Sequence, residues 1–118
     1  MGRLIVNTFS EDAIAAPQNR QPNYLVVSVT DSDGEPVTGL AVPNFKVDPM
    51  IVGPGGALVN IVDVNAGRLA GTYLVRVVPI RTETWKPGVY IFAVAVERSR
   101  AKGTKPDRGQ NLASVLMD

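Results

Sequence analysis

The chain has 118 residues and a formal net charge of +1, and 45% of its residues are hydrophobic while 19% are charged. This length suits one domain with one core, over residues 1–118, and this balance excludes a disordered, solvating chain. Because the chain contains no cysteine and no histidine, disulfides, thiolate metal sites, cysteine nucleophiles and the commonest general base are all excluded.

The N-terminal segment is the first expected strand, at Arg3–Phe9. Only a three-residue apolar run, at residues 4–6, precedes the polar Asn7, so the segment does not have the pattern of a signal peptide. The longest apolar run, Val89–Val96, is far shorter than the roughly 20 residues of a membrane-spanning helix. We therefore expect no membrane span, and cytoplasmic residence as the default.

Apolar and β-branched residues recur in short segments that turn-forming residues separate. The segments that we expect to be strands are Arg3–Phe9, Tyr24–Thr30, Phe45–Val47, Leu58–Val64, Thr72–Val78, Val89–Val96 and Asn111–Met117. Ser10–Ala16 is compatible with a single helical turn, which Pro17 would end. No longer amphipathic helix is predicted. This spacing favours an all-β, immunoglobulin-like β-sandwich of about seven antiparallel strands.

Three of these segments alternate large apolar residues with smaller or polar ones, which is typical of strands with one buried face. The expected core residues in them are Leu25, Val27, Val29, Tyr73, Val75, Val77, Tyr90, Phe92, Val94 and Val96. Arg76 falls on the opposite face from its neighbours Val75 and Val77, as a half-buried strand requires.

A family resemblance follows from the turns and strand starts. Residues 29–40 read Val-Thr-Asp-Ser-Asp-Gly-Glu-Pro-Val-Thr-Gly-Leu, and Asn44-Phe45 follows. Together with Gly71-Thr72-Tyr73 and Gly88-Val89-Tyr90, this pattern resembles bacterial immunoglobulin-like modules over about residues 24–96. The resemblance implies a spacer, an adhesive unit or an accessory domain, and it implies no catalytic residue.

The shared motifs have physical roles in a turn and in a strand. Gly34 can supply a positive φ, and Pro36 can set the direction in which the chain leaves the turn. A tyrosine near a strand start can tie its hydroxyl to neighbouring backbone. We therefore expect these motifs to stabilise the fold.

Three carboxylates in one turn, Asp31, Asp33 and Glu35, are weak candidates for a calcium site, because calcium prefers hard oxygen ligands. The spacing does not match an EF-hand: Gly34 stands at the fourth place instead of the sixth, and the twelfth place is Val42. We expect a solvated turn here, with no metal and no cofactor.

Two other segments invite catalytic or phosphate-binding hypotheses. Gly53–Gly56 is followed by no Lys-Ser or Lys-Thr pair, so we expect a flexible connection there and no phosphate loop. Ser99 and Lys102 are close in sequence, but no third group would position them for nucleophilic catalysis. We therefore expect that the chain is not an enzyme.

The strongest charge asymmetry is a basic loop at residues 98–108, before the closing strand expected at 110–117. Residues 98–118 carry five positive and two negative charges, while residues 1–97 carry seven positive and nine negative. The loop is either solvated or a contact for an acidic protein surface or a lipid head group. It contains no aromatic residue to stack on bases, so nucleic acid is not expected. The candidate binding residues are Arg98, Arg100, Lys102, Lys105 and Arg108.

Two apolar features are further candidates for partner binding. Trp85 falls outside the regular alternation, and it is either an exposed binding anchor or a cover on the end of the core. On the strand that follows, Val89, Ile91, Ala93 and Ala95 occupy the face opposite the expected core. They would form a patch suited to self-association, unless the chain termini fold over them.

We therefore predict a non-catalytic protein-interaction or structural module, which associates with itself or is a subunit of a larger assembly. The alternative is a carbohydrate- or polymer-binding accessory domain of a bacterial surface or secreted protein. That alternative depends on Trp85 and neighbouring tyrosines as an aromatic platform.

Overall fold

The computed structural model describes residues 3–9, 11–12, 22–51, 59–80, 84–85, 88–99 and 105–117. Its elements are β1 (Leu4–Phe9), β2 (Glu11–Asp12), β3 (Asn23–Asp31), the 3-10 helix η1 (Val42–Asn44), β4 (Phe45–Ile51), β5 (Val59–Ala66), β6 (Thr72–Pro79), β7 (Gly88–Arg98) and β8 (Asp107–Met117). Strands dominate the described residues, which confirms the predicted all-β class.

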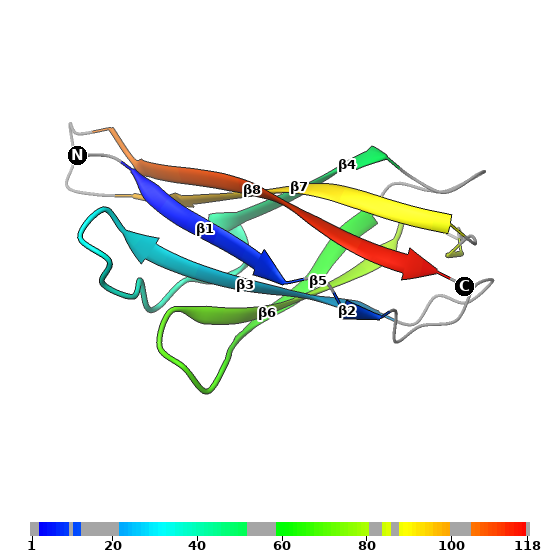
Figure 1. The fold of residues 1–118 in the computed structure, drawn as a ribbon, viewed down its shortest axis with the longest axis horizontal. Coiled ribbons are helices and arrows are strands. Elements are labelled where there is room, and N and C mark those ends of the chain that lie inside the picture. The colour runs from blue at the N-terminus through cyan, green and yellow to red at the C-terminus, as the bar shows by residue number, and fades with distance from the viewer. Residues whose placement is uncertain are drawn as a thin grey trace.

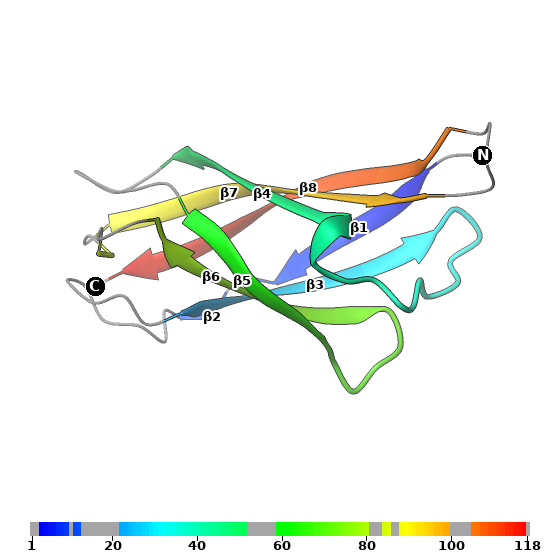
Figure 2. The same ribbon diagram turned by 180° about the vertical axis from the view of Figure 1, so that it is seen from behind.

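The strands form two four-stranded sheets, in the orders β1-β3-β6-β5 and β2-β8-β7-β4 (Figures 1 and 2). All neighbours are antiparallel except the two-residue β2, which pairs in parallel with β8. Seven long strands remain when the two-residue β2 is left aside. In chain order, the first, second, fourth and fifth of them (β1, β3, β5 and β6) form one sheet, and the third, sixth and seventh (β4, β7 and β8) form the other. This is the topology of an immunoglobulin-like sandwich, so the fold prediction is confirmed.

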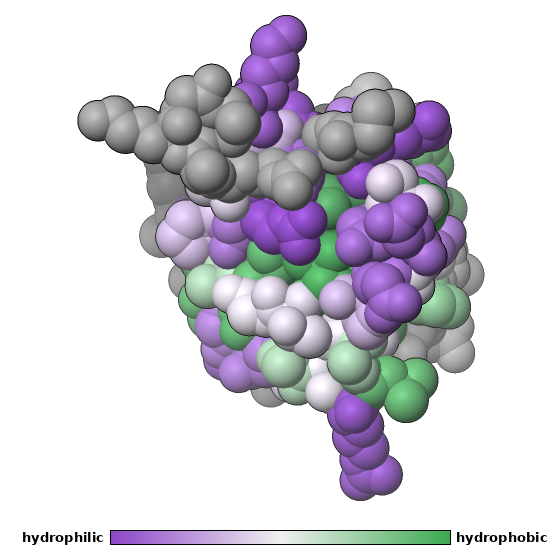
Figure 3. All heavy atoms as spheres, turned by 90° about the vertical axis from the view of Figure 1, so that its left-hand side faces the viewer, coloured by the Kyte–Doolittle hydropathy of each residue, from purple (hydrophilic) through white to green (hydrophobic). Residues whose placement is uncertain are grey.

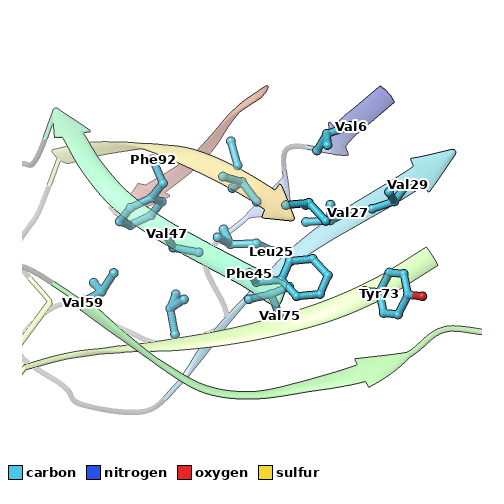
Figure 4. Packing of buried hydrophobic residues seen from close by; sticks show 14 of the residues in the cluster. Val6, Leu25, Val27, Val29, Phe45, Val47, Val59, Tyr73, Val75 and Phe92 are labelled. Atoms are coloured by element: carbon cyan, nitrogen blue, oxygen red, sulfur yellow. The ribbon is translucent and has the colours of Figure 1, made fainter. Parts of the chain in front are cut away.

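The core lies between the sheets, where every second side chain of β3, β6 and β7 is buried as predicted. Buried residues from both layers meet there (Figure 4). The ring of Phe45 on β4 lies edge-on to that of Tyr73 on β6, with centroids 5.4 Å apart. Because burial of one such side chain contributes about 1.5–3 kcal/mol, this alternating pattern specifies which face of each strand turns inward.

Two predicted turn devices are present. Gly34 has a φ of 83°, as the turn after β3 requires. The Tyr73 hydroxyl donates a hydrogen bond to the carbonyl oxygen of Val37 at 2.6 Å and accepts one from the amide of Leu40 at 3.3 Å. The tyrosine therefore ties the start of β6 to the connection between β3 and η1.

Some predicted boundaries are wrong. Glu11 and Asp12 form a short strand along β8 and no helical turn. Strand pairing also extends into the predicted basic loop, because Arg98 is the last residue of β7 and β8 begins at Asp107. The closing strand therefore starts three residues earlier than the expected 110. The predicted connection at 53–56 lies outside the described residues.

One side of the sandwich is closed by the N-terminal strand. β1 pairs with β3 in its own sheet and also lies against β8 of the other sheet. The Asn111 side chain donates from Nδ2 to the carbonyl oxygen of Val6 at 2.7 Å, and the Thr8 hydroxyl donates to the carbonyl oxygen of Leu112. The first strand therefore joins the two sheets along this side.

Candidate binding surface

The outer face of β7 and β8 carries an apolar stripe, formed by Val89, Ile91, Ala93 and Leu112. The first three alternate with buried residues of β7, and the register places Leu112 of β8 directly opposite Ala93. Val89 is 45% exposed and Leu112 is 53% exposed, while Ile91 and Ala93 are half-buried. The predicted apolar face is therefore present and accessible among the described residues.

The same face is hollowed where β7 ends and β4 and β8 begin. A groove of about 390 Å³ lies there, with Lys46, Ala95, Gln110 and Arg108 among its lining residues. Lys46 and Gln110 stand opposite Ala95 on either side of β7. The groove forms because the short Ala95 side chain is flanked by two longer ones. Its volume is within the range of small binding sites, about 300–1,000 Å³.

Two cross-strand ion pairs close the β7–β8 hairpin beside this groove. Arg98 bonds the carboxylate of Asp107 through Nη2 at 2.6 Å and Nε at 3.1 Å, and the Asp107 side chain is only 2% exposed. Arg108 pairs with Glu97 at 3.0 Å. The strand register sets these partners, since Arg98 lies opposite Asp107 and Glu97 lies opposite Arg108.

The prediction that Arg98 and Arg108 belong to a free basic loop is therefore wrong. Both side chains lie on paired strands, and a carboxylate of the same chain offsets each charge. Lys105 is exposed, as predicted for a loop cation. Arg100 and Lys102 lie outside the described residues. Among the described residues, the predicted basic surface therefore has less net positive charge than its composition suggests. Arg108 lies at the rim of the groove.

Trp85 belongs to the core. The indole is fully buried, at 0% exposure, and it lies edge-on to the ring of Tyr90, with centroids 5.1 Å apart. The prediction of an exposed binding anchor is therefore wrong, and the alternative of a cover on the core is right. This burial takes Trp85 out of the aromatic platform that the carbohydrate-binding alternative requires, and Tyr73 and Tyr90 are buried as well, while Tyr24 is half-buried.

The acidic turn, residues 31–36, uses one of its three carboxylates to hold itself together. Oδ1 of Asp31 accepts hydrogen bonds from the amides of Asp33 and Glu35, at 2.9 and 3.0 Å. The Asp33 and Glu35 residues are exposed. Within the described part of the chain, no three acidic side chains gather as a metal site would require.

The outer face of the other sheet has a different character. Arg76 of β6 bonds both carboxylate oxygens of Asp63 on β5, and Tyr24 of β3 lies on the other side of Arg76 in the register. The hydrogen bond from Arg76 lowers the pKa of Asp63 more than burial raises it, and Asp63 in turn raises the pKa of Arg76. This face therefore carries an ion pair beside apolar residues: Phe9 is 52% exposed, and the register places it in a row with the half-buried Val26 and Leu74.

Sequence reasoning did not find the groove or the roles of Lys46 and Gln110 in it. These residues are 64 positions apart in the chain, and only the pairing of β4 and β8 with β7 brings them to one place. The sequence feature that could have predicted the groove is the small Ala95, which stands between the larger Val94 and Val96.

Searches against protein-family descriptions, curated proteins and solved structures found no match to this chain. In the described residues, no helix is long and apolar enough to cross a membrane.

Proposed function

We propose that this chain is a non-catalytic protein-interaction module that associates with itself through the apolar stripe. The observation that carries the proposal is the exposure of Val89 and Leu112 next to Ile91 and Ala93 on one sheet face. The outer face of an antiparallel sandwich is ordinarily polar, because water solvates it. Burial of apolar area against a partner would stabilise a complex by about 25 cal/mol per Å² before the entropic terms that oppose association.

The face is a better binding surface than the strand edges. β4, at one edge, contains Pro49, which has no N–H to donate, and its register shifts between Pro49 and Ile51. β5, at the edge of the other sheet, has a register shift between Ile61 and Asp63. Prolines and bulges at edges oppose the addition of a further strand.

A second copy of the chain is the partner that the dimensions support. The molecule extends 44 × 28 × 19 Å, so even the narrower of its two long faces, 44 × 19 Å or about 840 Å², matches the roughly 800 Å² that each partner contributes to a stable interface. The outer face of the other sheet also exposes Phe9, but it carries the ion pair of Arg76 and Asp63, and charged residues are depleted at the centre of interfaces, which favours the β7–β8 face as the contact.

The test is the solution mass by light scattering over a concentration series, for the wild-type chain and for Ile91→Lys. We expect a wild-type dimer or larger oligomer, and a folded monomer for the variant, because the introduced ammonium group would be buried without a partner. The matched control is Asn7→Lys, which adds the same charge at an exposed position on the outer face of the other sheet.

Wild-type protein that remains monomeric at all concentrations would refute self-association through this face. Equal loss of mass in Ile91→Lys and Asn7→Lys would also count against it, because a general effect of charge would then explain both. Circular dichroism of each variant distinguishes a lost interface from a lost fold.

A further inference from the structure

The rim of the groove carries two cations, Lys46 and Arg108, and one carboxylate, Glu97, which pairs with Arg108 at 3.0 Å. The side chains of Lys46 and Arg108, both among the lining residues, are 75% and 70% exposed. The nearest carboxylate oxygen to the Lys46 ammonium is that of Asp48, at 3.9 Å, a separation at which an exposed pair contributes little. The amide of Gln110 adds a neutral donor beside them. Two cations and one carboxylate give this rim a net charge of +1, and Lys46, whose carboxylate contact is the longer, is the group most open to an incoming carboxylate.

The acidic turn supplies carboxylates of the right kind. Asp31 is engaged within the turn, while the exposed Asp33 and Glu35 side chains form no ion pair with any described residue. The positive φ of Gly34 and the hydrogen bonds to Asp31 hold the turn in one shape. A turn held in this way loses little conformational entropy when it binds.

The groove and the acidic turn lie at the same end of the molecule. Asp31 pairs with Leu4, and the preceding Arg3 forms a bridge with Arg108 at the start of β8. Figure 1 shows the turn after β3 and the start of β8 together on its left-hand side. Seen from this end, hydrophilic residues surround an apolar patch (Figure 3).

We propose that the groove of one copy receives the acidic turn of a second copy, with Asp33 and Glu35 bonded to Lys46, Arg108 and Gln110. Since turn and groove share one end, two copies that meet end to end can make both contacts at once, which is the reciprocal pattern of a two-fold interface. Charge-assisted hydrogen bonds between ammonium or guanidinium groups and carboxylates would hold the contact.

This end contact goes beyond the association through the apolar stripe. The stripe runs from Val89 to Ala93 of β7, and the groove begins at Ala95, about 7 Å further along the strand at about 3.4 Å per residue, so the two surfaces are distinct neighbours on one face. The end of the molecule measures 28 × 19 Å, or about 530 Å², below the roughly 800 Å² per partner of a stable interface. The contact is therefore weak, sensitive to salt, and able to link stripe-mediated dimers into larger assemblies.

A charge exchange tests the proposal by sedimentation equilibrium. All proteins carry Ile91→Lys, so that the apolar stripe does not contribute. One variant reverses the groove with Lys46→Glu and Arg108→Gln, and another reverses the turn with Asp33→Lys and Glu35→Lys. We expect self-association of the background protein to weaken about tenfold between about 0.02 M and about 0.5 M NaCl, because salt screens exposed charges.

Each reversed variant alone should remain monomeric at low salt, and an equimolar mixture of the two should associate, because opposite charges then face each other in both contacts. Lys105→Glu is the matched control: it changes charge near the groove without lining it, and it should shift the dissociation constant less than about twofold. Melting curves confirm that each variant is folded.

Three results would overturn the proposal: a background protein that stays monomeric up to about 1 mM at low salt, a reversed variant that associates as well as the background, or a mixture that does not associate. Because every protein in this experiment lacks a functional apolar stripe, none of these results bears on the proposed stripe-mediated association. Failure of one proposal is therefore distinguishable from failure of the other.

Discussion

The two long sides of the sandwich are built differently. Along one side, β1 belongs to one sheet and lies against β8 of the other, with side-chain hydrogen bonds between them. Along the other side, β4 and β5 are the edge strands of separate sheets, and neither pairs with the other. Hydrogen bonds between β1 and β8 therefore close one side, which we call the sealed side. The other side, the open side, consists of the two edge strands β4 and β5.

The difference indicates where this fold is stabilised and where a partner can bind. On the sealed side, β1 and β8 approach closely at Gly109, where an added Cβ would clash with the backbone of Leu4. The open side is protected by Pro49 and by register shifts in both edge strands, which oppose the addition of a foreign strand. Association is therefore expected on a sheet face or at an end of the sandwich.

The largest effect is expected for Gly109→Val on the sealed side. A Cβ at this position would overlap the carbonyl oxygen of Leu4 and lie 2.8 Å from its carbonyl carbon, so β1 would have to move away from β8. We expect a loss of about 3 kcal/mol or more in the free energy of unfolding, measured by urea denaturation.

Gly34→Ala is the control for Gly109→Val. A Cβ at Gly34 would meet no atom within 4 Å, and only the positive φ of 83° opposes it, for a loss of about 1 kcal/mol. Equal losses in the two variants would show that the close approach of β1 to β8 does not limit stability.

An intermediate effect is expected for two matched asparagines. Asn111 donates to the Val6 carbonyl on the sealed side, and Asn44 donates to the Glu97 carbonyl at 2.9 Å beside β4. Asn111→Ala should lower the free energy of unfolding by about 1 kcal/mol, because its bond is partly shielded from water. Asn44→Ala should lower it by about 0.5 kcal/mol, since water can replace an exposed bond. A larger loss in the Asn44 variant would contradict the contrast between the sides.

The smallest effect concerns the ion pair of Asp63 on β5 with Arg76. The folded state lowers the pKa of Asp63 below its ordinary value of 3.8, so the pair stabilises the fold above that pH. This contribution is lost as the pH falls through the lowered pKa. Asp63→Asn should therefore lower the melting temperature slightly at neutral pH and by less in strong acid. A difference between the two proteins that does not change with pH would count against the ion pair as its cause.

Much of the fold was predictable because strand patterns are local. The alternation in Thr72–Pro79 and in residues 89–96 predicts that Tyr73, Phe92 and their neighbours lie in the core, and their burial confirms it. The turn at Gly34 was predictable for the same reason, since a positive φ favours glycine whatever the surrounding fold.

The candidate site was less predictable. The apolar face of β7 follows from alternation, but Trp85 was ambiguous, because a single aromatic residue outside a periodic segment carries no information about depth. The basic residues were misplaced because hairpin register, and not local composition, brings Glu97 opposite Arg108 and Arg98 opposite Asp107.

By itself, the sequence determined the class of fold, the inward face of the main strands and the absence of cysteine and histidine chemistry, because composition and period-two alternation depend on nearby residues alone. Only the tertiary structure decided that β1 seals one side against β8, that Trp85 is buried, and that Lys46, Ala95 and Gln110 meet in a groove. These features depend on which distant strands pair and in which register, and those are set by the packing of the whole core.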